Sequence, residues 1–248
     1  DIRDRFVKSG YDVDALFPHY DLRPGDVLRL DRDFIIPKNP MFEMKWLEIF
    51  RIWFFKKYLS NVDSIYEFGC GTGRNLVALA QLFPAKNLYG FEWVKPSVDI
   101  INLLAKKHHY HMEGGLFDFF SPNRKLRFAP NSAVLTRAAL EQVGGDFDKF
   151  LTFLLKQPPA FCVHSEPIIE LYDDENLVDH LAVAFQKKRN YLDGYLNRLR
   201  ELEQQGKIDI LAVHRIPFGS LHLDPYSYIV WRSKVSKVNK INFLKKHE

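Results

Sequence analysis

The feature of this sequence that most constrains its fold is a buried strand that leads through a glycine-rich turn into a helix. Residues 64–68 (SIYEF) read as a short buried strand, residues 69–73 (GCGTG) as the turn, and residues 75–83 (NLVALAQLF) as the helix. Glycine permits a tight turn between strand and helix, and it lets a ligand lie directly against the backbone. The segment therefore predicts a βα unit with a ligand site at its turn.

The same alternation of strands and helices continues along the chain. Further strands are predicted over residues 87–93, 132–136 and 160–164, and further helices over residues 97–105 and 147–155. Such alternation implies a doubly wound, mainly parallel sheet. The last two β-rich runs, residues 208–216 and 226–231, are joined by only nine residues, which is too short for a parallel crossover. The predicted fold class is α/β, with a seven-stranded, mostly parallel sheet that ends in an antiparallel C-terminal hairpin.

The chain divides into four parts by composition. Residues 1–60 are dense in aromatic and charged side chains, and we expect an N-terminal cap whose helix over residues 41–58 forms one wall of a site. Residues 61–233 form the main domain. Within it, residues 170–206 are predicted to be a helical insertion on the acceptor side, before the strand over residues 208–216, with one long helix over residues 175–205 that bends at Gly194. Residues 234–248 form a basic tail, which is compatible with a linker to another domain.

Composition narrows the class of protein and the kind of partner. The 248 residues, of which 46% are hydrophobic and 27% charged, suit one globular domain with a cap. The formal net charge of +4 is a mild basic excess, so nucleic acid is not the expected partner. Two cysteines favour a reducing compartment, and we expect a cytoplasmic protein. No apolar run approaches the ~18 residues of a membrane span. A homodimer remains open.

Two acidic residues distinguish the glycine-rich turn from a dinucleotide site. Glu67 precedes the first glycine, where a carboxylate repels pyrophosphate and attracts an ammonium group. Glu92 ends the next strand, 19 residues after Gly73, where an acid can accept both hydroxyls of a ribose. The spacing G-x-G-x-G also differs from the dinucleotide pattern G-x-G-x-x-G. The turn therefore favours a ligand that carries both an ammonium group and a ribose, and it disfavours a nicotinamide-dependent oxidoreductase.

Three segments resemble the class I S-adenosylmethionine-dependent methyltransferases over roughly residues 64–231. Residues 67–73 (EFGCGTG) are similar to the family's first motif, residues 90–93 (GFEW) to its ribose-binding strand end, and residues 115–119 (GLFDF) to its third cofactor element. The resemblance implies S-adenosylmethionine as the cofactor. It places Glu67 near the ammonium, Gly69, Gly71 and Gly73 along the methionine portion, Asn75 at the helix start, Glu92 at the ribose, Trp93 beside the adenine, and Asp118 at the adenine amine with Phe119 packed nearby.

Candidate catalytic residues lie at the end of the predicted strand over residues 160–164 or in the C-terminal hairpin loop. His164 is the first choice of general base and His222 the second, and Glu166 or Asp224 would orient either of them. Because the last two strands are antiparallel, we expect the loop to lie at the same edge of the sheet as His164 and Glu166. The same four residues are also a possible divalent-metal set, although no metal site is predicted.

The resulting prediction is an S-adenosylmethionine-dependent O-methyltransferase that acts on a small hydroxylated or saccharide acceptor. One alternative is methylation of RNA or protein, which would need a continuous basic face. Another is a non-catalytic module that keeps the fold and binds a cofactor or a partner.

Overall fold

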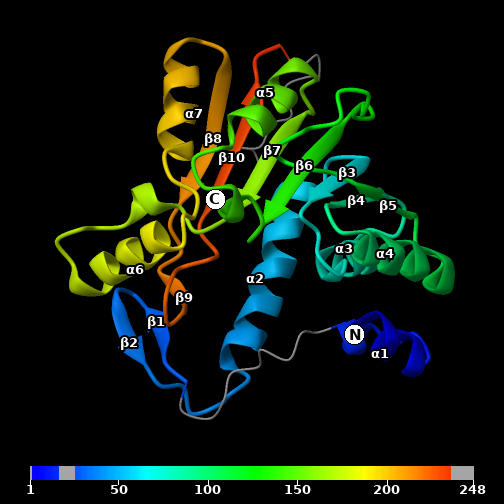
Figure 1. The fold of residues 1–248 in the computed structure, drawn as a ribbon, viewed down its shortest axis with the longest axis horizontal. Helices are drawn as coiled ribbons and strands as arrows, with labels where there is room; N and C mark the ends of the chain where they lie inside the picture. Colours follow the sequence, from blue (N-terminus) through cyan, green and yellow to red (C-terminus); the bar gives the residue numbers. More distant parts are fainter. Residues whose placement is uncertain (1, 17–25, 236–248) are drawn as a thin grey trace.

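The computed structural model describes residues 2–16 and 26–235, and a seven-stranded sheet is its centre (Figure 1). The strand order is β5-β4-β3-β6-β7-β10-β8, and β10 runs antiparallel to both of its neighbours. This confirms the predicted α/β class, the mostly parallel sheet and the antiparallel hairpin. From one edge to the other the strands are β5 (Met112–Leu116), β4 (Asn87–Glu92), β3 (Ser64–Phe68), β6 (Ser132–Arg137), β7 (Phe161–Ser165), β10 (Tyr228–Ser233) and β8 (Ile208–His214).

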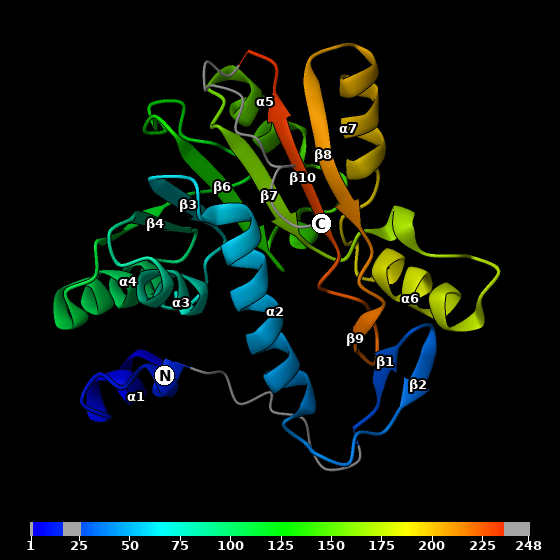
Figure 2. The same cartoon turned by 180° about the vertical axis from the view of Figure 1, so that it is seen from behind.

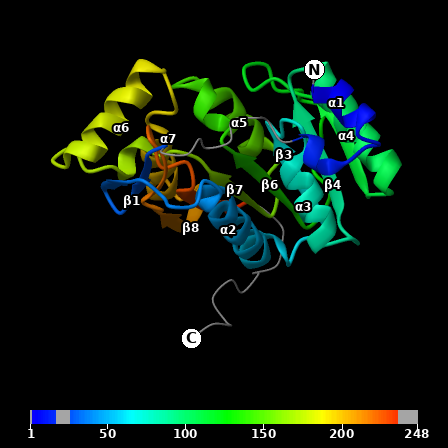
Figure 3. The same cartoon turned by 90° about the horizontal axis from the view of Figure 1, so that it is seen from below.

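Helices cover both faces of the sheet. The helices α2 (Phe42–Leu59), α3 (Arg74–Leu82) and α4 (Lys95–His108) pack against one face, and α5 (Asp148–Lys156) and α7 (Tyr195–Gln204) pack against the other. Figure 3 shows α2 and α3 on one side of the strands and α5 on the other. In β6, Ala133 and Leu135 enter the first core while Val134 enters the second, as the two-residue period of a strand requires. Burial on both faces explains the continuous apolar runs at residues 133–135 of β6 and 161–163 of β7.

The turn between β3 and α3 depends on glycine at specific positions. Gly69 has a φ of +70°, and a Cβ there would lie 2.3 Å from the Cβ of Ala139. Gly73 has a φ of +82° and immediately precedes α3. A side chain at Gly69 would therefore push the turn away from the segment that follows β6.

The N-terminal residues form two separate structures. The short helix α1 (Ile2–Lys8) and the turn η1 (Val13–Leu16) pack on α3 and α4, where Phe6 and Leu16 meet Leu104. The predicted helix over residues 41–58 is confirmed as α2, whose buried aromatic residues belong to the main core.

A second, three-stranded antiparallel sheet was not predicted from the sequence. Its order is β2 (Asp33–Ile35), β1 (Leu28–Leu30) and β9 (Phe218–Ser220), so the segment between β8 and β10 contributes its third strand. Figures 1 and 2 both show this sheet beside α6 (Leu177–Lys188), at one end of the molecule. The small sheet thus joins the N-terminal segment to the C-terminal hairpin.

The prediction of one long helix over residues 175–205 is wrong. The segment forms two helices, α6 and α7, which are separated by Asn190 and Gly194 with φ values of +52° and +84°. These left-handed conformations stop α6 and redirect the chain. The leucines of α7 then cover the sheet, so this half of the predicted insertion is part of the core. Of the predicted basic tail, residues 236–248 lie outside the described residues.

Candidate active site

A cavity of about 620 Å³ opens at the carboxyl ends of β3, β4, β5 and β6, where open α/β sheets bind their ligands. Six of the nine residues predicted to bind a cofactor line it. They are Gly69, Gly71, Glu92, Trp93, Asp118 and Phe119. The remaining lining residues come from the start of α4, from the turn after β5 and from the turn after β6, and include Ser97, Phe117, Phe120, Ala138, Ala139 and Gln142.

Glu92 is held rigidly at the end of β4. Its Oε2 accepts a hydrogen bond of 2.9 Å from the backbone N–H of Gly71, and its Oε1 accepts one of 2.9 Å from the N–H of Trp93. The carboxylate thereby joins the glycine-rich turn to the neighbouring strand end. The Trp93 side chain beside it is 77% exposed, so its ring is available at the mouth of the cavity.

Glu67, Gly73 and Asn75 do not line the cavity. Glu67 is fully buried, and its Oε1 accepts a hydrogen bond of 2.7 Å from Asn75 Nδ2. Its Oε2 is buried without a hydrogen-bond partner among the described residues. Burial raises the pKa of Glu67 to about 7. The free oxygen leaves this buried carboxyl able to accept a donor from a ligand.

Asp118 and Phe119 form the turn after β5. Asp118 is exposed, and its Oδ1 accepts a hydrogen bond of 2.8 Å from the N–H of Phe120. Phe119 packs edge to face on Phe150 of α5, with the ring centroids 4.8 Å apart. The turn is thus fixed by its own hydrogen bond and by the core.

His164 is an internal residue of the sheet. It is buried in β7, with Nδ1 2.9 Å from Thr136 Oγ1 and Nε2 3.0 Å from the Tyr195 hydroxyl. Burial lowers its pKa to about 3, so the ring is neutral at physiological pH. Both ring nitrogens are engaged by protein groups, and His164 does not line the cavity. The geometry therefore supports a packing role for this residue.

Glu166 shapes the turn that follows β6. Its carboxylate accepts hydrogen bonds from the backbone N–H groups of Ala139, Leu140 and Glu141, at 3.0, 3.2 and 3.2 Å. Because Ala139 lines the cavity, Glu166 fixes one of the cavity's walls through the backbone. The Thr136 side chain, which contacts His164 Nδ1, also hydrogen-bonds to this carboxylate.

The loop that carries His222 and Asp224 leaves the main sheet at the expected edge, because Tyr228 pairs with Ser165 and the N–H of Glu166 donates a hydrogen bond of 2.9 Å to the Ser227 carbonyl. His222 is exposed and stacks on Phe185 of α6, with centroids 4.5 Å apart. Both oxygens of the buried Asp224 are held by Arg29 and Arg215, at 3.0 and 2.9 Å. From that edge the segment between β8 and β10 extends away from the sheet and forms β9. His222 and Asp224 therefore contact α6 and the two arginines, whereas His164 and Glu166 both lie beside Thr136.

Sequence reasoning missed a polar cluster beside α2. Arg51 of α2 and Arg137 at the end of β6 both lie near Glu67, and the charge of each lowers the pKa of that carboxyl, against the larger effect of burial. The Arg137 guanidinium lies 5.6 Å above the ring of Tyr226, whose hydroxyl donates a hydrogen bond of 2.9 Å to Glu43 Oε1. The signal that could have found this cluster is the position of Arg137, directly after the predicted strand over residues 132–136.

The similarity of this chain to known proteins is a similarity of fold. No family model matches the sequence, and no curated protein matches it. Among solved structures, the chain resembles an O-methyltransferase from neocarzinostatin biosynthesis in complex with S-adenosylmethionine and 2-hydroxy-5-methyl naphthoic acid. That match has a TM-score of 0.56 and 14% identity, and covers 78% of this chain and 56% of that one. The chain has the fold of the class I S-adenosylmethionine-dependent methyltransferases.

Two further solved structures share this methyltransferase fold. Geranyl diphosphate methyltransferase, in complex with GPP and sinefungin, matches with a TM-score of 0.54 and 12% identity, and 79% of this chain and 80% of that chain are covered. Magnesium protoporphyrin IX methyltransferase from Synechocystis PCC 6803, with bound SAH, matches with a TM-score of 0.52 and 12% identity, and the coverage is 78% and 84%. The chain spans about half the length of the first solved structures it matches.

Three other features of this methyltransferase fold bear on function. Within residues 2–16 and 26–235, no three His, Cys, Asp or Glu side chains are grouped so that they could hold a metal ion. No helix of the described chain is long and apolar enough to cross a membrane. Cys70 and Cys162 are both free and buried.

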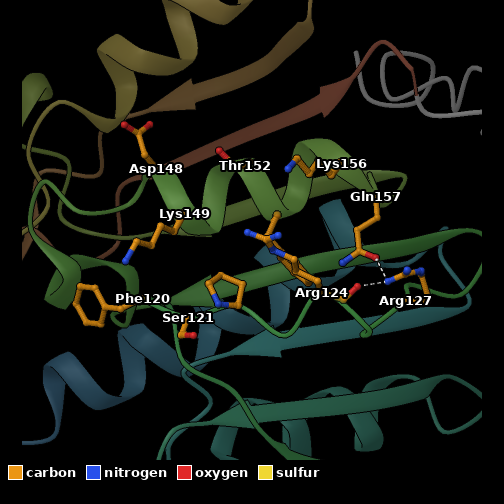
Figure 4. A pocket seen from close by; sticks show the side chains of 11 residues that line it. Phe120, Ser121, Arg124, Arg127, Asp148, Lys149, Thr152, Lys156 and Gln157 are labelled. Atoms are coloured by element: carbon orange, nitrogen blue, oxygen red, sulfur yellow. Dashed lines mark hydrogen bonds between the residues drawn. The ribbon is translucent and has the colours of Figure 1, made fainter.

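A second hollow of about 670 Å³ adjoins the first and is basic (Figure 4). It shares Phe120 with the first cavity, and α5 and the loop after β5 form its walls. Its cationic side chains are Arg124, Arg127, Lys149 and Lys156. Arg127 donates a hydrogen bond of 3.0 Å to Gln157 Oε1, and the carboxylate of Asp148 lies 3.7 Å from Arg198. We call this hollow the basic groove.

Proposed function

We propose that this chain is an S-adenosylmethionine-dependent methyltransferase. The observation that carries the proposal is the Glu92 carboxylate, which is fixed by two backbone N–H groups at the ligand-binding edge of a methyltransferase fold. Each carboxylate oxygen has further lone pairs, so Glu92 can also accept both ribose hydroxyls. A cavity of about 620 Å³ falls within the roughly 300–1,000 Å³ typical of cofactor sites.

Other residues in the cavity, together with Glu67 beside it, fit the remaining parts of this cofactor. The unpartnered Oε2 of Glu67 suits its ammonium group, and the glycine-rich turn leaves bare backbone for the methionine portion. The exposed Trp93 ring suits the adenine, and the exposed Asp118 carboxylate suits the adenine amine. When bound, the cofactor supplies a methyl group on a positively charged sulfur. The protein's own contribution is to position an acceptor and to exclude water from it.

The acceptor in this proposal is a small hydroxylated molecule, and an O-methyl product follows. The support is the aromatic cluster that Trp46, Phe50 and Tyr226 form next to Arg137, because aromatic faces with polar side chains suit hydroxylated rings and saccharides. The fold neighbours include an O-methyltransferase solved with a hydroxylated naphthoic acid. The basic groove favours one alternative, an RNA acceptor, whose binding would weaken steeply as salt concentration rises.

Calorimetric titration with S-adenosylmethionine, S-adenosylhomocysteine and NAD tests the proposal. We expect the first two to bind and NAD not to bind. Glu92→Gln should weaken both affinities by about tenfold or more, since about 1.4 kcal/mol corresponds to each factor of ten. Glu113→Gln is the matched control, because Glu113 is exposed on the adjacent strand β5. A folded protein that binds neither compound, or that binds NAD instead, would contradict the proposal.

A further inference from the structure

Arg51 and Arg137 stand out because they are partly buried cations that form no direct ion pair among the described residues. Neither makes a hydrogen bond or an ion pair with another described residue, and the Nε of each is buried with no acceptor. Arg51 comes from α2 and Arg137 from the end of β6. Arg137 directly precedes Ala138 and Ala139, which line the cofactor cavity. Both guanidinium groups act on the carboxyl of Glu67, at the end of the strand that leads into the glycine-rich turn.

Two other arginines of the chain show how a buried guanidinium with a structural role is paired with carboxylates. Arg29 and Arg215 each contact two aspartates, at 2.5–3.0 Å, and all four groups are held in one network. Arg51 and Arg137 have no such aspartate. Burial and the nearby charge of Arg137 both lower the pKa of Arg51, which shows that the pair disfavours its own charged state. A buried charged donor without an acceptor costs free energy that an incoming anion removes.

The carboxylates around this pair do not neutralise it. Glu67 is near both arginines, but its Oε1 is taken by Asn75 and its Oε2 suits the cofactor ammonium in the proposed function. Glu166 is near Arg137, but it accepts three backbone N–H groups. Glu48 of α2 is exposed. The positive charge therefore remains available to a ligand.

The side chains next to Arg137 indicate which other groups the ligand carries. Arg137 lies over the ring of Tyr226, which packs against Trp46 and Phe50 of α2 with centroids 4.8 and 5.8 Å apart. Glu43, on the same face of α2 as Trp46 and Phe50, accepts a hydrogen bond from the Tyr226 hydroxyl. The arginine pair thus adjoins the aromatic cluster of Trp46, Phe50 and Tyr226, an arrangement that suits an apolar or ring-shaped molecule carrying an anionic group.

We propose that Arg51 and Arg137 bind a carboxylate or phosphate group of the methyl acceptor. This inference rests on the proposed function, because it makes the arginine pair part of the acceptor site. Guanidinium groups recognise both anions through paired N–H donors, so the pair would fix the acceptor's orientation towards the cavity. The acceptor class is therefore a small hydroxylated molecule that carries an acid.

Binding to the protein saturated with S-adenosylhomocysteine tests the inference. Three probes are titrated by calorimetry: inorganic phosphate, 4-hydroxybenzoate, and the neutral 4-hydroxybenzyl alcohol. We expect at least one anion to bind, and the alcohol to bind about tenfold more weakly than the benzoate if the carboxylate is the recognised group. Arg51→Gln and Arg137→Gln should each weaken the binding of the anion by about tenfold. Arg200→Gln, at an exposed position on α7, makes the same change of charge and should have no effect.

The outcomes separate the two proposals. If wild-type protein fails to bind S-adenosylhomocysteine, the proposed function itself fails. If it binds S-adenosylhomocysteine but neither anion, or if the two glutamine variants retain wild-type anion affinity, the inference about the arginines is overturned. Preference for phosphate over benzoate identifies a phosphorylated acceptor, and the reverse identifies a carboxylic acid. Retained binding of S-adenosylhomocysteine by each variant shows that it is folded.

Discussion

The substitution Asp224→Asn separates a structural role from a catalytic one. Asp224 is 1% exposed and accepts hydrogen bonds from Arg29 Nε at 3.0 Å and Arg215 Nη2 at 2.9 Å. Asp179 is the second anion of the network and is fully buried. The isosteric asparagine keeps the shape of the side chain but removes one negative charge, so two largely buried guanidinium groups would share a single carboxylate.

The expected cost follows from this uncompensated charge. Removing one partner of a buried ion pair typically destabilises a protein by about 3–5 kcal/mol. For a chain of this size, each kcal/mol lowers Tm by about 2–4 °C, so the predicted drop is roughly 6–20 °C. Because Asp224 does not line the cofactor cavity, the affinity for S-adenosylhomocysteine should be unchanged at temperatures where the variant is folded.

Thermal and urea unfolding measure this cost, and Asp209→Asn is the matched control. Asp209 pairs with Arg232 and Lys234, but its side chain is 34% exposed, so its loss should cost at most about 1 kcal/mol. Equal destabilisation by the two variants would refute the argument that burial of the network sets the cost. A large loss of methyl transfer by a stably folded Asp224→Asn variant would instead restore a catalytic role for this residue.

Three further predictions concern the cavity and the core. Gly69→Ala should weaken the binding of S-adenosylhomocysteine by about tenfold and lower Tm, since the added Cβ would lie 2.3 Å from that of Ala139. Gly145→Ala is the control because the space around Gly145 is open, and equal effects of the two variants would count against the steric argument. The pKa of about 3 for His164 lies below its ordinary 6.5, so the unfolded chain binds a proton that the folded chain excludes. The free energy of unfolding should therefore fall as pH drops from about 6.5 towards 3. Urea titrations should show that His164→Gln removes much of this slope, and an unchanged slope would assign it to other groups. Lys149→Glu, in the basic groove, should leave the calorimetric affinity for S-adenosylhomocysteine unchanged, and a marked change would make the groove part of the cofactor site.

The sheet and the cofactor cavity were predictable because their signals are local. The strand, turn and helix of residues 64–83 are adjacent in sequence, and glycine is required where the backbone has positive φ. Parallel strands bring their carboxyl ends to one edge, so Glu92 could be placed near the turn without knowledge of any contact, whereas Asp118 was placed by the resemblance to the family. The short link before the last strand also fixed its direction.

The acceptor side was not predictable because long-range contacts determine it. The strand β1 has only three residues, and its Arg29 is buried by partners 150 and 195 positions away. His222 follows β9 away from the main sheet because that segment pairs with β1. The periodic leucines of residues 177–202 suggested one continuous helix, whereas the chain's left-handed turn at Gly194 allows the second helix to cover the sheet.

The small sheet also determines the order in which the molecule can be completed. Arg29 and Asp224 are separated by 195 positions, and β1 pairs with β9 over a similar span. During synthesis from the N-terminus, β1 leaves the ribosome long before its partner strand exists. Contacts of such long range slow folding, since the intervening chain must be ordered before they form. Closure of this sheet is therefore a late event, and a chain that ends before residue 224 would leave Arg29 without one of its two carboxylates.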